Sequence, residues 1–151
     1  MNKKLLFGGL LIGVVFIVAK SKDFLNTAYE SVIDRMAAAI QDFEGWYPGS
    51  RSFRNNNPGN LRWFSDSFPW TGATGVDESN HVIFDSYESG LSALKYQLRL
   101  AFSGSSSIYS PFDTLYQFFT KYAEGNQDAY ARFVAARLGV SPDSTLGSLG
   151  G

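Results

Sequence analysis

An uncharged apolar run near the N-terminus constrains this chain most. Residues 5–19 read LLFGGLLIGVVFIVA, with Lys3, Lys4, Lys20 and Lys22 on the two sides. As a helix the run spans about 22 Å, against about 30 Å for the hydrocarbon core of a bilayer. Because the flanking lysines can extend toward the interface, the run predicts a membrane anchor. A cleaved signal peptide and a buried soluble helix are the alternatives.

The rest of the chain predicts one folded domain. Residues 1–22 form the anchor or signal segment, residues 23–146 the domain, and residues 147–151 (GSLGG) a flexible tail. An amphipathic helix begins near residue 23, with apolar side chains every four residues, and Gly45 is placed to end it. The members of that series are Ala28, Val32, Met36 and Ile40.

The remaining elements are a hairpin and three helices. Residues 71–84, TGATGVDESNHVIF, have the pattern of a small hairpin with DESN at its tip. Asp85 is placed to cap the next helix, Pro111 to open another, and Asn126 to cap the last, which Gly139 ends. The expected fold is therefore α+β, mainly α, with one small β-hairpin and a preceding N-terminal hydrophobic helix.

The composition excludes several classes of function. The chain has no cysteine and a single histidine, His81, which is expected at the surface. A Cys–His peptidase and a zinc site with the usual imidazole ligands are therefore excluded. The net charge of −1 leaves no basic footprint for nucleic acid. We expect no metal and no other cofactor, so an enzyme of this composition must use carboxylates.

Glu44 is the carboxylate that the pattern singles out. It continues the four-residue apolar series by one step, so it points toward the buried side of the last helical turn. The negative end of the helix dipole and the apolar neighbours Phe43, Trp46 and Tyr47 disfavour its charge. Both effects raise its pKa, as a general acid near neutral pH requires. The alternative is a side chain that turns to solvent or pairs with Arg51 or Arg54.

The loop FRNNNPGNLRW, residues 53–63, predicts a binding surface beside this acid. Pro58 and Gly59 suit a type II turn, and asparagines can brace such a turn. Several amides together also offer donors and acceptors for hydroxyl and amide groups, and nearby aromatic rings suit sugar faces. A purely structural turn is the alternative. The residues expected to bind a glycan are Trp46, Arg54, Asn56, Asn57, Asn60 and Trp63.

Three segments carry a resemblance to a known family. AAAIQDFEGWYPGSRSFRNNNPGNLRW, FDSYESGLSALKYQL and YARFVAARLGVSPDSTL resemble phage-encoded, lysozyme-like peptidoglycan-degrading proteins, which include virion-associated lytic transglycosylases. The resemblance covers about residues 33–146. It implies a lysozyme-like domain, cleavage between MurNAc and GlcNAc, Glu44 as the catalytic acid, and Tyr122 in the cleft. Gly45 stands where serine follows the acid in better-known transglycosylases, and NNPGN replaces their Gly-Leu-Met-Gln segment.

These features together predict a lytic transglycosylase acting in phage entry or host lysis. A muramidase-type hydrolase is one alternative, and its second carboxylate would come from Asp66, Asp77, Glu78 or Asp85. A non-enzymatic glycan-binding or virion structural protein is the other. The expected partners are peptidoglycan, a membrane through residues 5–19, and virion proteins. The expected location is a virion internal membrane or the host inner membrane, with the domain facing the periplasm.

Overall fold

A computed structural model gives the arrangement of the chain. It describes residues 8–63 and 70–150, and for residues 8–25 the backbone alone. In these ranges the chain is mainly helical with one two-stranded antiparallel sheet, as expected. The elements are α1 (Gly8–Glu44), α2 (Arg51–Arg54), β1 (Ala73–Val76), β2 (Val82–Phe84), α3 (Tyr87–Ser103), α4 (Leu115–Tyr122), α5 (Gln127–Leu138) and a short 3-10 helix, η1 (Leu146–Ser148).

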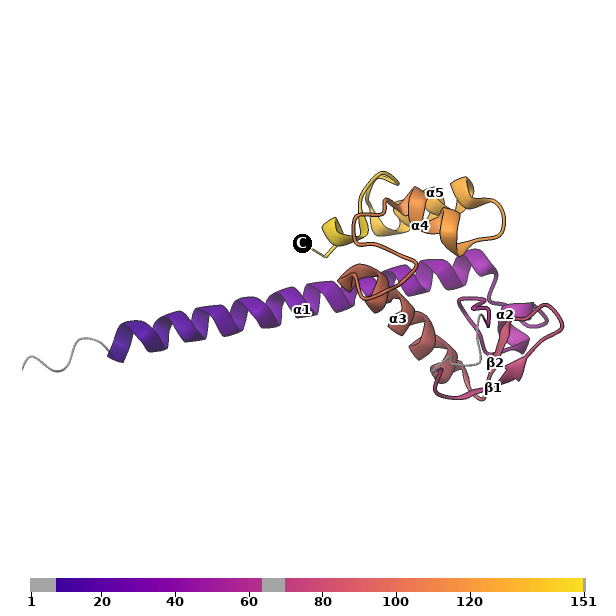
Figure 1. Ribbon diagram of the computed structural model, residues 1–151, viewed down its shortest axis with the longest axis horizontal. Helices are drawn as coiled ribbons and strands as arrows, with labels where there is room; N and C mark the ends of the chain where they lie inside the picture. The colour runs from indigo at the N-terminus through magenta and orange to yellow at the C-terminus, as the bar shows by residue number, and fades with distance from the viewer. Residues whose placement is uncertain (1–7, 64–69, 151) are drawn as a thin grey trace, which may run out of the picture.

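Helix α1 is one continuous helix of 37 residues. Its N-terminal part projects beyond the other elements, and its C-terminal part lies between them (Figure 1). The boundary predicted at residues 22 and 23 therefore falls inside a helix. The apolar series of α1 faces inward as expected, since Met36 and Ile40 are fully buried. Gly45 ends α1 with φ +78°, a conformation that costs glycine little.

The predicted membrane anchor is corrected. Within the described residues, no helix is long and apolar enough to cross a membrane. The uncharged run ends before Lys20, and even a helix over all of residues 5–19 would span only about 22 Å, which is shorter than a bilayer core. Residues 1–7, which contain its start, lie outside the described residues. The expected location in a virion or host membrane is therefore wrong. The membrane partner through residues 5–19 stays a prediction, because part of that run lies outside the described residues.

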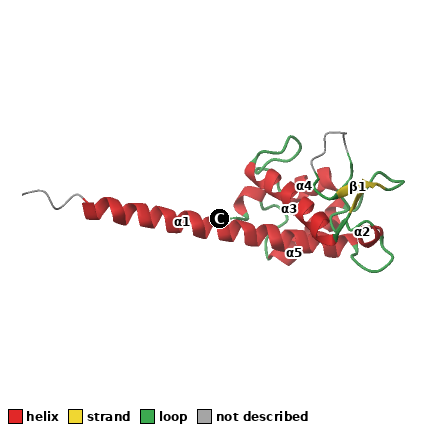
Figure 2. Ribbon diagram, turned by 90° about the horizontal axis from the view of Figure 1, so that it is seen from below, coloured by secondary structure: helices red, strands yellow, loops and turns green. Residues whose placement is uncertain are grey.

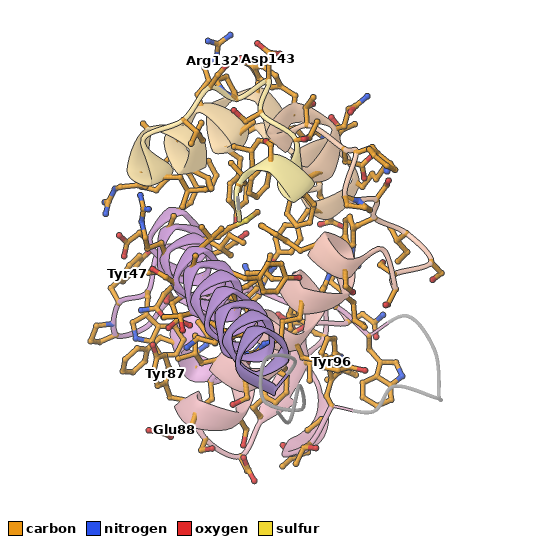
Figure 3. All side chains as sticks on the ribbon, turned by 90° about the vertical axis from the view of Figure 1, so that its left-hand side faces the viewer. Tyr47, Tyr87, Glu88, Tyr96, Arg132 and Asp143 are labelled. Atoms are coloured by element: carbon orange, nitrogen blue, oxygen red, sulfur yellow. The ribbon has the colours of Figure 1, made fainter. Side chains whose placement is uncertain are left out.

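The rest of the chain packs on both sides of the C-terminal half of α1. Viewed along α1, Arg132 and Asp143 lie at one extreme of the molecule and Glu88 at the other (Figure 3). Helix α5 contacts both α1 and α4, whereas α3 contacts α1 and the hairpin strand β2. The strands lie at the end of the molecule away from the N-terminus of α1 (Figure 2). The C-terminal half of α1 thus lies at the centre of the core and contacts both α3 and α5.

The predicted hairpin is confirmed. Strands β1 and β2 pair antiparallel, with Val76 opposite Val82, and residues 77–80 form the turn. The surface position expected for His81 is wrong, because this residue is only 5% exposed. The segment at residues 61–63 runs beside it, with Trp63 N donating to Asn80 O and Val82 N donating to Leu61 O. That non-local segment pairs with the backbone on both sides of the histidine, and the side chain of Arg51 lies against its ring.

The caps and the C-terminus differ from expectation in detail. Ser86 caps α3 in place of Asp85, and α4 begins at Leu115 under a Thr114–Gln117 capping box, four residues later than Pro111. Asn126 precedes α5, but its side chain makes no capping hydrogen bond. Residues 147–150 are not a free tail. Leu146 is fully buried and Leu149 packs against the core, so this segment completes the fold.

Candidate active site

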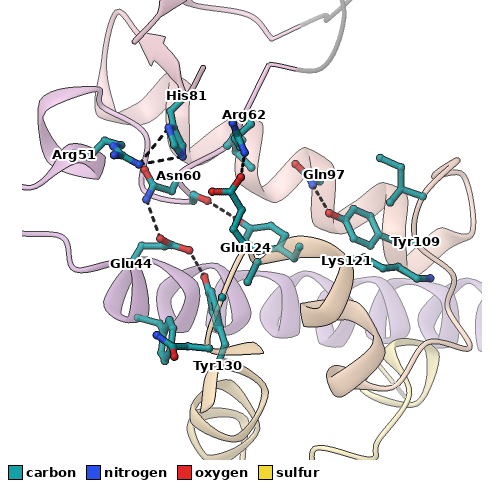
Figure 4. Close-up of a pocket in the computed structure, with 18 residues that line it drawn as sticks. Glu44, Arg51, Asn60, Arg62, His81, Gln97, Tyr109, Lys121, Glu124 and Tyr130 are labelled. Carbon is teal, nitrogen blue, oxygen red and sulfur yellow. Dashed lines mark hydrogen bonds and ion pairs between the residues drawn. The ribbon is translucent and has the colours of Figure 1, made fainter. Parts of the chain in front are cut away.

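A cavity of about 570 Å³ opens beside the C-terminal end of α1. We call it the Glu44 cavity. Its walls come from segments far apart in the sequence, and the close-up in Figure 4 shows Asn60 and Tyr130 directed at Glu44 and Gln97, Tyr109 and Lys121 farther from it. The walls are the end of α1, Arg51 of α2, residues 59–62, His81, Gln97 of α3, residues 108–109, residues 121–126, and Tyr130 of α5. The cavity thus lies between the hairpin side of the molecule and helices α4 and α5.

Both carboxylate oxygens of Glu44 are held by donors. Tyr130 donates its hydroxyl to Oε1 at 2.9 Å, and Asn60 donates Nδ2 to Oε2 at 2.9 Å. Burial raises the pKa of Glu44, and the hydrogen bonds from Asn60 and Tyr130 and the charge of Arg51 offset part of that rise. The net shift is upward, so Glu44 keeps its proton to a higher pH than an ordinary glutamate does. A carboxyl group of this kind can serve as a general acid.

Tyr130 is held rigidly, so its hydroxyl has a fixed position. Its ring stacks on Phe43 at 3.9 Å and on Phe119 at 4.2 Å between centroids. Burial raises the pKa of Tyr130 well above its ordinary value, so the hydroxyl stays protonated and remains a donor. The sequence pattern places Tyr130 on the apolar side of α5 and carries no sign of this second function.

In the asparagine loop, residues 53–63, one of the four asparagines lines the cavity, and the other three hold the loop in place. Asn57 is fully buried; its Nδ2 donates to Leu61 O and Val82 O, and its Oδ1 accepts from Leu61 N. The expectation that Asn57 binds sugar is therefore wrong, because its amide is fully used in bracing the turn. Asn60 adopts φ +50°, and this left-handed conformation accompanies the contact of its amide with Glu44. Asn60 is thus the asparagine of this loop that lines the cavity.

Asn56 also braces the loop. It has φ +50°, and its Nδ2 donates to Phe84 O at 3.1 Å. A Cβ added to Gly90 of α3 would lie 1.8 Å from the backbone oxygen of Asn56, so α3 and the loop meet where only glycine fits. Tyr122 of α4 fixes the next turn by donating its hydroxyl to Gly59 O at 2.6 Å. These contacts hold the loop against two helices.

The structure brings together three of the eight predicted site residues. Glu44, Asn60 and Tyr122 line the Glu44 cavity. Trp46, Arg54, Asn56, Asn57 and Trp63 are not among the described residues that line it. Trp46 instead packs against Phe53 and Tyr87, with centroids 5.2 and 5.0 Å away. Arg54 is exposed and donates to Gly49 O, so it holds the short loop before α2.

Glu124 is the second carboxylate of the cavity, and the sequence did not single it out. It lies between α4 and α5 and forms an ion pair with Arg62 on the opposite wall (Figure 4). Among the earlier candidates, Asp66 lies outside the described residues. Asp77, Glu78 and Asp85 are not among the described lining residues. Within residues 8–63 and 70–150, no group of three or more His, Asp or Glu side chains could hold a metal ion.

Comparisons with protein-family models, with curated proteins and with solved structures found no match to this chain. The family resemblance of the three sequence segments thus stays a prediction. The features that matter are one buried acid with a raised pKa, two fixed donors on it, and an open space beside it.

Proposed function

We propose that this chain cleaves the glycan strand of peptidoglycan in a lysozyme-like domain, with Glu44 as the general acid. The observation that carries the proposal is the environment of Glu44. Its carboxyl group is largely buried and has a raised pKa, yet it borders a cavity of about 570 Å³. That volume lies within the range of ligand pockets, and a polar and aromatic lining suits sugar rings.

In the proposed first step, protonated Glu44 gives its proton to the glycosidic oxygen as the bond from that oxygen to C1 breaks. The leaving sugar then carries a hydroxyl group, and Glu44 becomes a carboxylate. Asn60 and Tyr130 already donate to its two oxygens, so they stabilise the negative charge as it forms. C1 is left with oxocarbenium character, as in other glycosidases.

A lytic transglycosylase completes the reaction with one carboxylate. The 6-hydroxyl of the same MurNAc attacks C1, its proton passes to Glu44, and a 1,6-anhydro sugar results. We favour this route because Glu124, the second carboxylate of the described lining, is engaged by Arg62. A hydrolase is the alternative, in which Glu124 activates water. Its position on the wall of the same cavity is the observation that supports this second route.

Substitution Glu44→Gln tests the proposed acid. Glutamine keeps the shape, and Tyr130 can still donate to its oxygen. Asn60 Oδ1 is buried without a partner among the described atoms, so a rotated Asn60 amide can accept from the new NH₂ group. We therefore expect a folded protein whose lysis of a peptidoglycan-containing gel is lost. Glu88→Gln, at an exposed position on α3, is the matched control and should lyse as the parent does.

One outcome of this test would exclude Glu44 as the general acid. If Glu44→Gln lyses the gel within a few-fold of the parent, Glu44 is not the acid. A non-enzymatic glycan-binding protein would show a third pattern. Purified protein would then sediment with intact sacculi, yet neither the parent nor any variant would release soluble fragments from them.

A further inference from the structure

The positive charges of the Glu44 cavity are not equally neutralised. Arg51, Arg62 and Lys121 are the arginine and lysine side chains in its described lining. Arg62 is in direct contact with Glu124, and Lys121 is in direct contact with Asp113. Among the described residues, the carboxylate paired with Arg51 is that of Asp77, whose Oδ2 lies 3.7 Å from Nε. Arg51 is therefore the least neutralised of the three cations.

Asp77 is already committed to the hairpin turn. Its Oδ1 accepts from Ser79 N and His81 N, both at 2.9 Å, and its Oδ2 accepts from Asn55 Nδ2 at 2.9 Å. Burial alone would raise the pKa of Asp77, but these hydrogen bonds outweigh it and lower the pKa to about 2. The Asp77 carboxylate thus accepts hydrogen bonds from three N–H donors of the turn and its surroundings, and its contact with Arg51 is longer, at 3.7 Å.

His81 holds Arg51 in place without adding charge. Arg51 Nη1 lies 3.4 Å from both ring nitrogens of His81. Burial lowers the pKa of His81, and the neighbouring charge of Arg51 lowers it further, so the ring is neutral at pH 7 and can accept from the guanidinium. The Arg51 side chain itself remains 44% exposed. Figure 4 shows it on the same side of the cavity as Asn60, across from the end of α1.

We propose that Arg51 binds a carboxylate group of the substrate and so selects carboxylate-bearing glycan strands over neutral ones. This inference rests on the proposed function of the same cavity. A guanidinium group matches a carboxylate through two parallel N–H donors, which gives both strength and direction. Peptidoglycan offers two sources of such a group. One is the free lactyl carboxylate of MurNAc in peptide-free strands, and the other is a carboxylate of the stem peptide.

Arg51 also connects substrate binding to the acid. The groups that act on Glu44 are neutral Asn60 and Tyr130, which donate to it, and charged Arg51, which lowers its pKa. Tyr122 lies close enough to be influenced by Glu44 and is neutral. A substrate carboxylate on Arg51 would offset that positive charge, so Glu44 would hold its proton more readily. Binding of the anionic substrate would thus favour the protonated, reactive form of the acid.

The test compares binding of two disaccharides that differ in the lactyl carboxylate. NMR titrations of the full chain would use GlcNAc–MurNAc and chitobiose, with the parent, Arg51→Gln, Arg51→Lys and Arg54→Gln. We expect the parent to prefer GlcNAc–MurNAc at least about tenfold, the loss expected for one hydrogen-bonded charge pair. Arg51→Gln should abolish this preference and Arg51→Lys should keep part of it. Arg54→Gln, on the same short helix but outside the cavity lining, should leave it unchanged.

Cleavage assays then identify the source of the carboxylate. A loss of kcat/KM in Arg51→Gln on peptide-free strands alone indicates the lactyl group, and a loss on peptide-bearing strands alone indicates the stem peptide. If the parent binds the two disaccharides equally and Arg51→Gln cleaves both kinds of strand as the parent does, the inference is overturned and the proposed function stands. If the parent releases no fragments from any strand, the proposed function fails, while the binding titrations still decide the role of Arg51.

Discussion

The hydroxyl of Tyr130 should tune the acidity of Glu44, and Tyr130→Phe isolates that effect. Phenylalanine keeps the ring that stacks between Phe43 and Phe119 and removes the donor that lies 2.9 Å from Glu44 Oε1. A hydrogen bond to a charged group contributes about 1.5–3 kcal/mol, against about 0.5–1.5 kcal/mol for a neutral pair. The ionised form of Glu44 therefore loses more than the protonated form does, by about 1–1.5 kcal/mol.

A difference of this size changes the ionisation equilibrium of Glu44 about tenfold, since 1.36 kcal/mol corresponds to one pKa unit. The pKa of Glu44 should therefore rise further in Tyr130→Phe. NMR titration of ¹³C-labelled glutamate carboxyl groups measures it directly. In a lysis assay, the loss of activity at alkaline pH should move to higher pH. Tyr29→Phe is the control, because that hydroxyl donates to Arg99 O outside the cavity lining. An unchanged or lowered pKa of Glu44 in Tyr130→Phe would refute the reasoning.

Two further predictions concern the loop that frames the cavity. Gly90→Ala should destabilise the fold by about 1–3 kcal/mol in thermal denaturation, because its Cβ would meet the backbone oxygen of Asn56. Gly75→Ala, where nothing lies within 4 Å, is the control, and equal losses in both would contradict the packing argument. Asp77 has a lowered pKa of about 2, so it stabilises the fold above its ordinary pKa of 3.8 and loses that effect as the pH falls toward 2. Asp77→Asn should flatten the pH dependence of the melting temperature between pH 4 and 2, and an unchanged slope there would exclude this role.

Local patterns predicted the elements that depend on local physics. The four-residue spacing places Glu44 on the inward face of α1 because helix geometry is set within a few residues. The hairpin was predictable for the same reason, since turn chemistry and alternation lie within residues 71–84. The asparagine loop shows the limit of this approach. By its local chemistry, either Asn57 or Asn60 could brace the turn. Only the packed structure reveals that Asn57 is buried and that Asn60 faces Glu44.

The partners of Glu44 and Arg51 depend on non-local contacts. Tyr130 lies 86 residues from Glu44 in the sequence, and its helical spacing alone predicts a core residue. Glu124 has no surrounding motif and enters the cavity because α4 and α5 place the turn between them there. His81 pairs through its backbone with Arg62 and contacts Arg51 through its ring, and neither partner belongs to the hairpin pattern that was read from the sequence. The inward position and the raised pKa of Glu44 could be predicted from the sequence, and the contacts of Tyr130 and Arg51 that modify this pKa could not.

The most direct measurement is a mass spectrum of what the purified chain releases from intact sacculi. If Glu44 protonates the glycosidic oxygen and the 6-hydroxyl of MurNAc attacks, soluble muropeptides will appear with 1,6-anhydro ends, each lighter by one water than a reducing end. The Glu44→Gln protein, examined in parallel, will release none. Reducing MurNAc ends throughout would instead assign the reaction to a hydrolase. Absence of soluble fragments from the parent chain, or equal release by Glu44→Gln, would contradict the proposal that Glu44 cleaves the glycan strand.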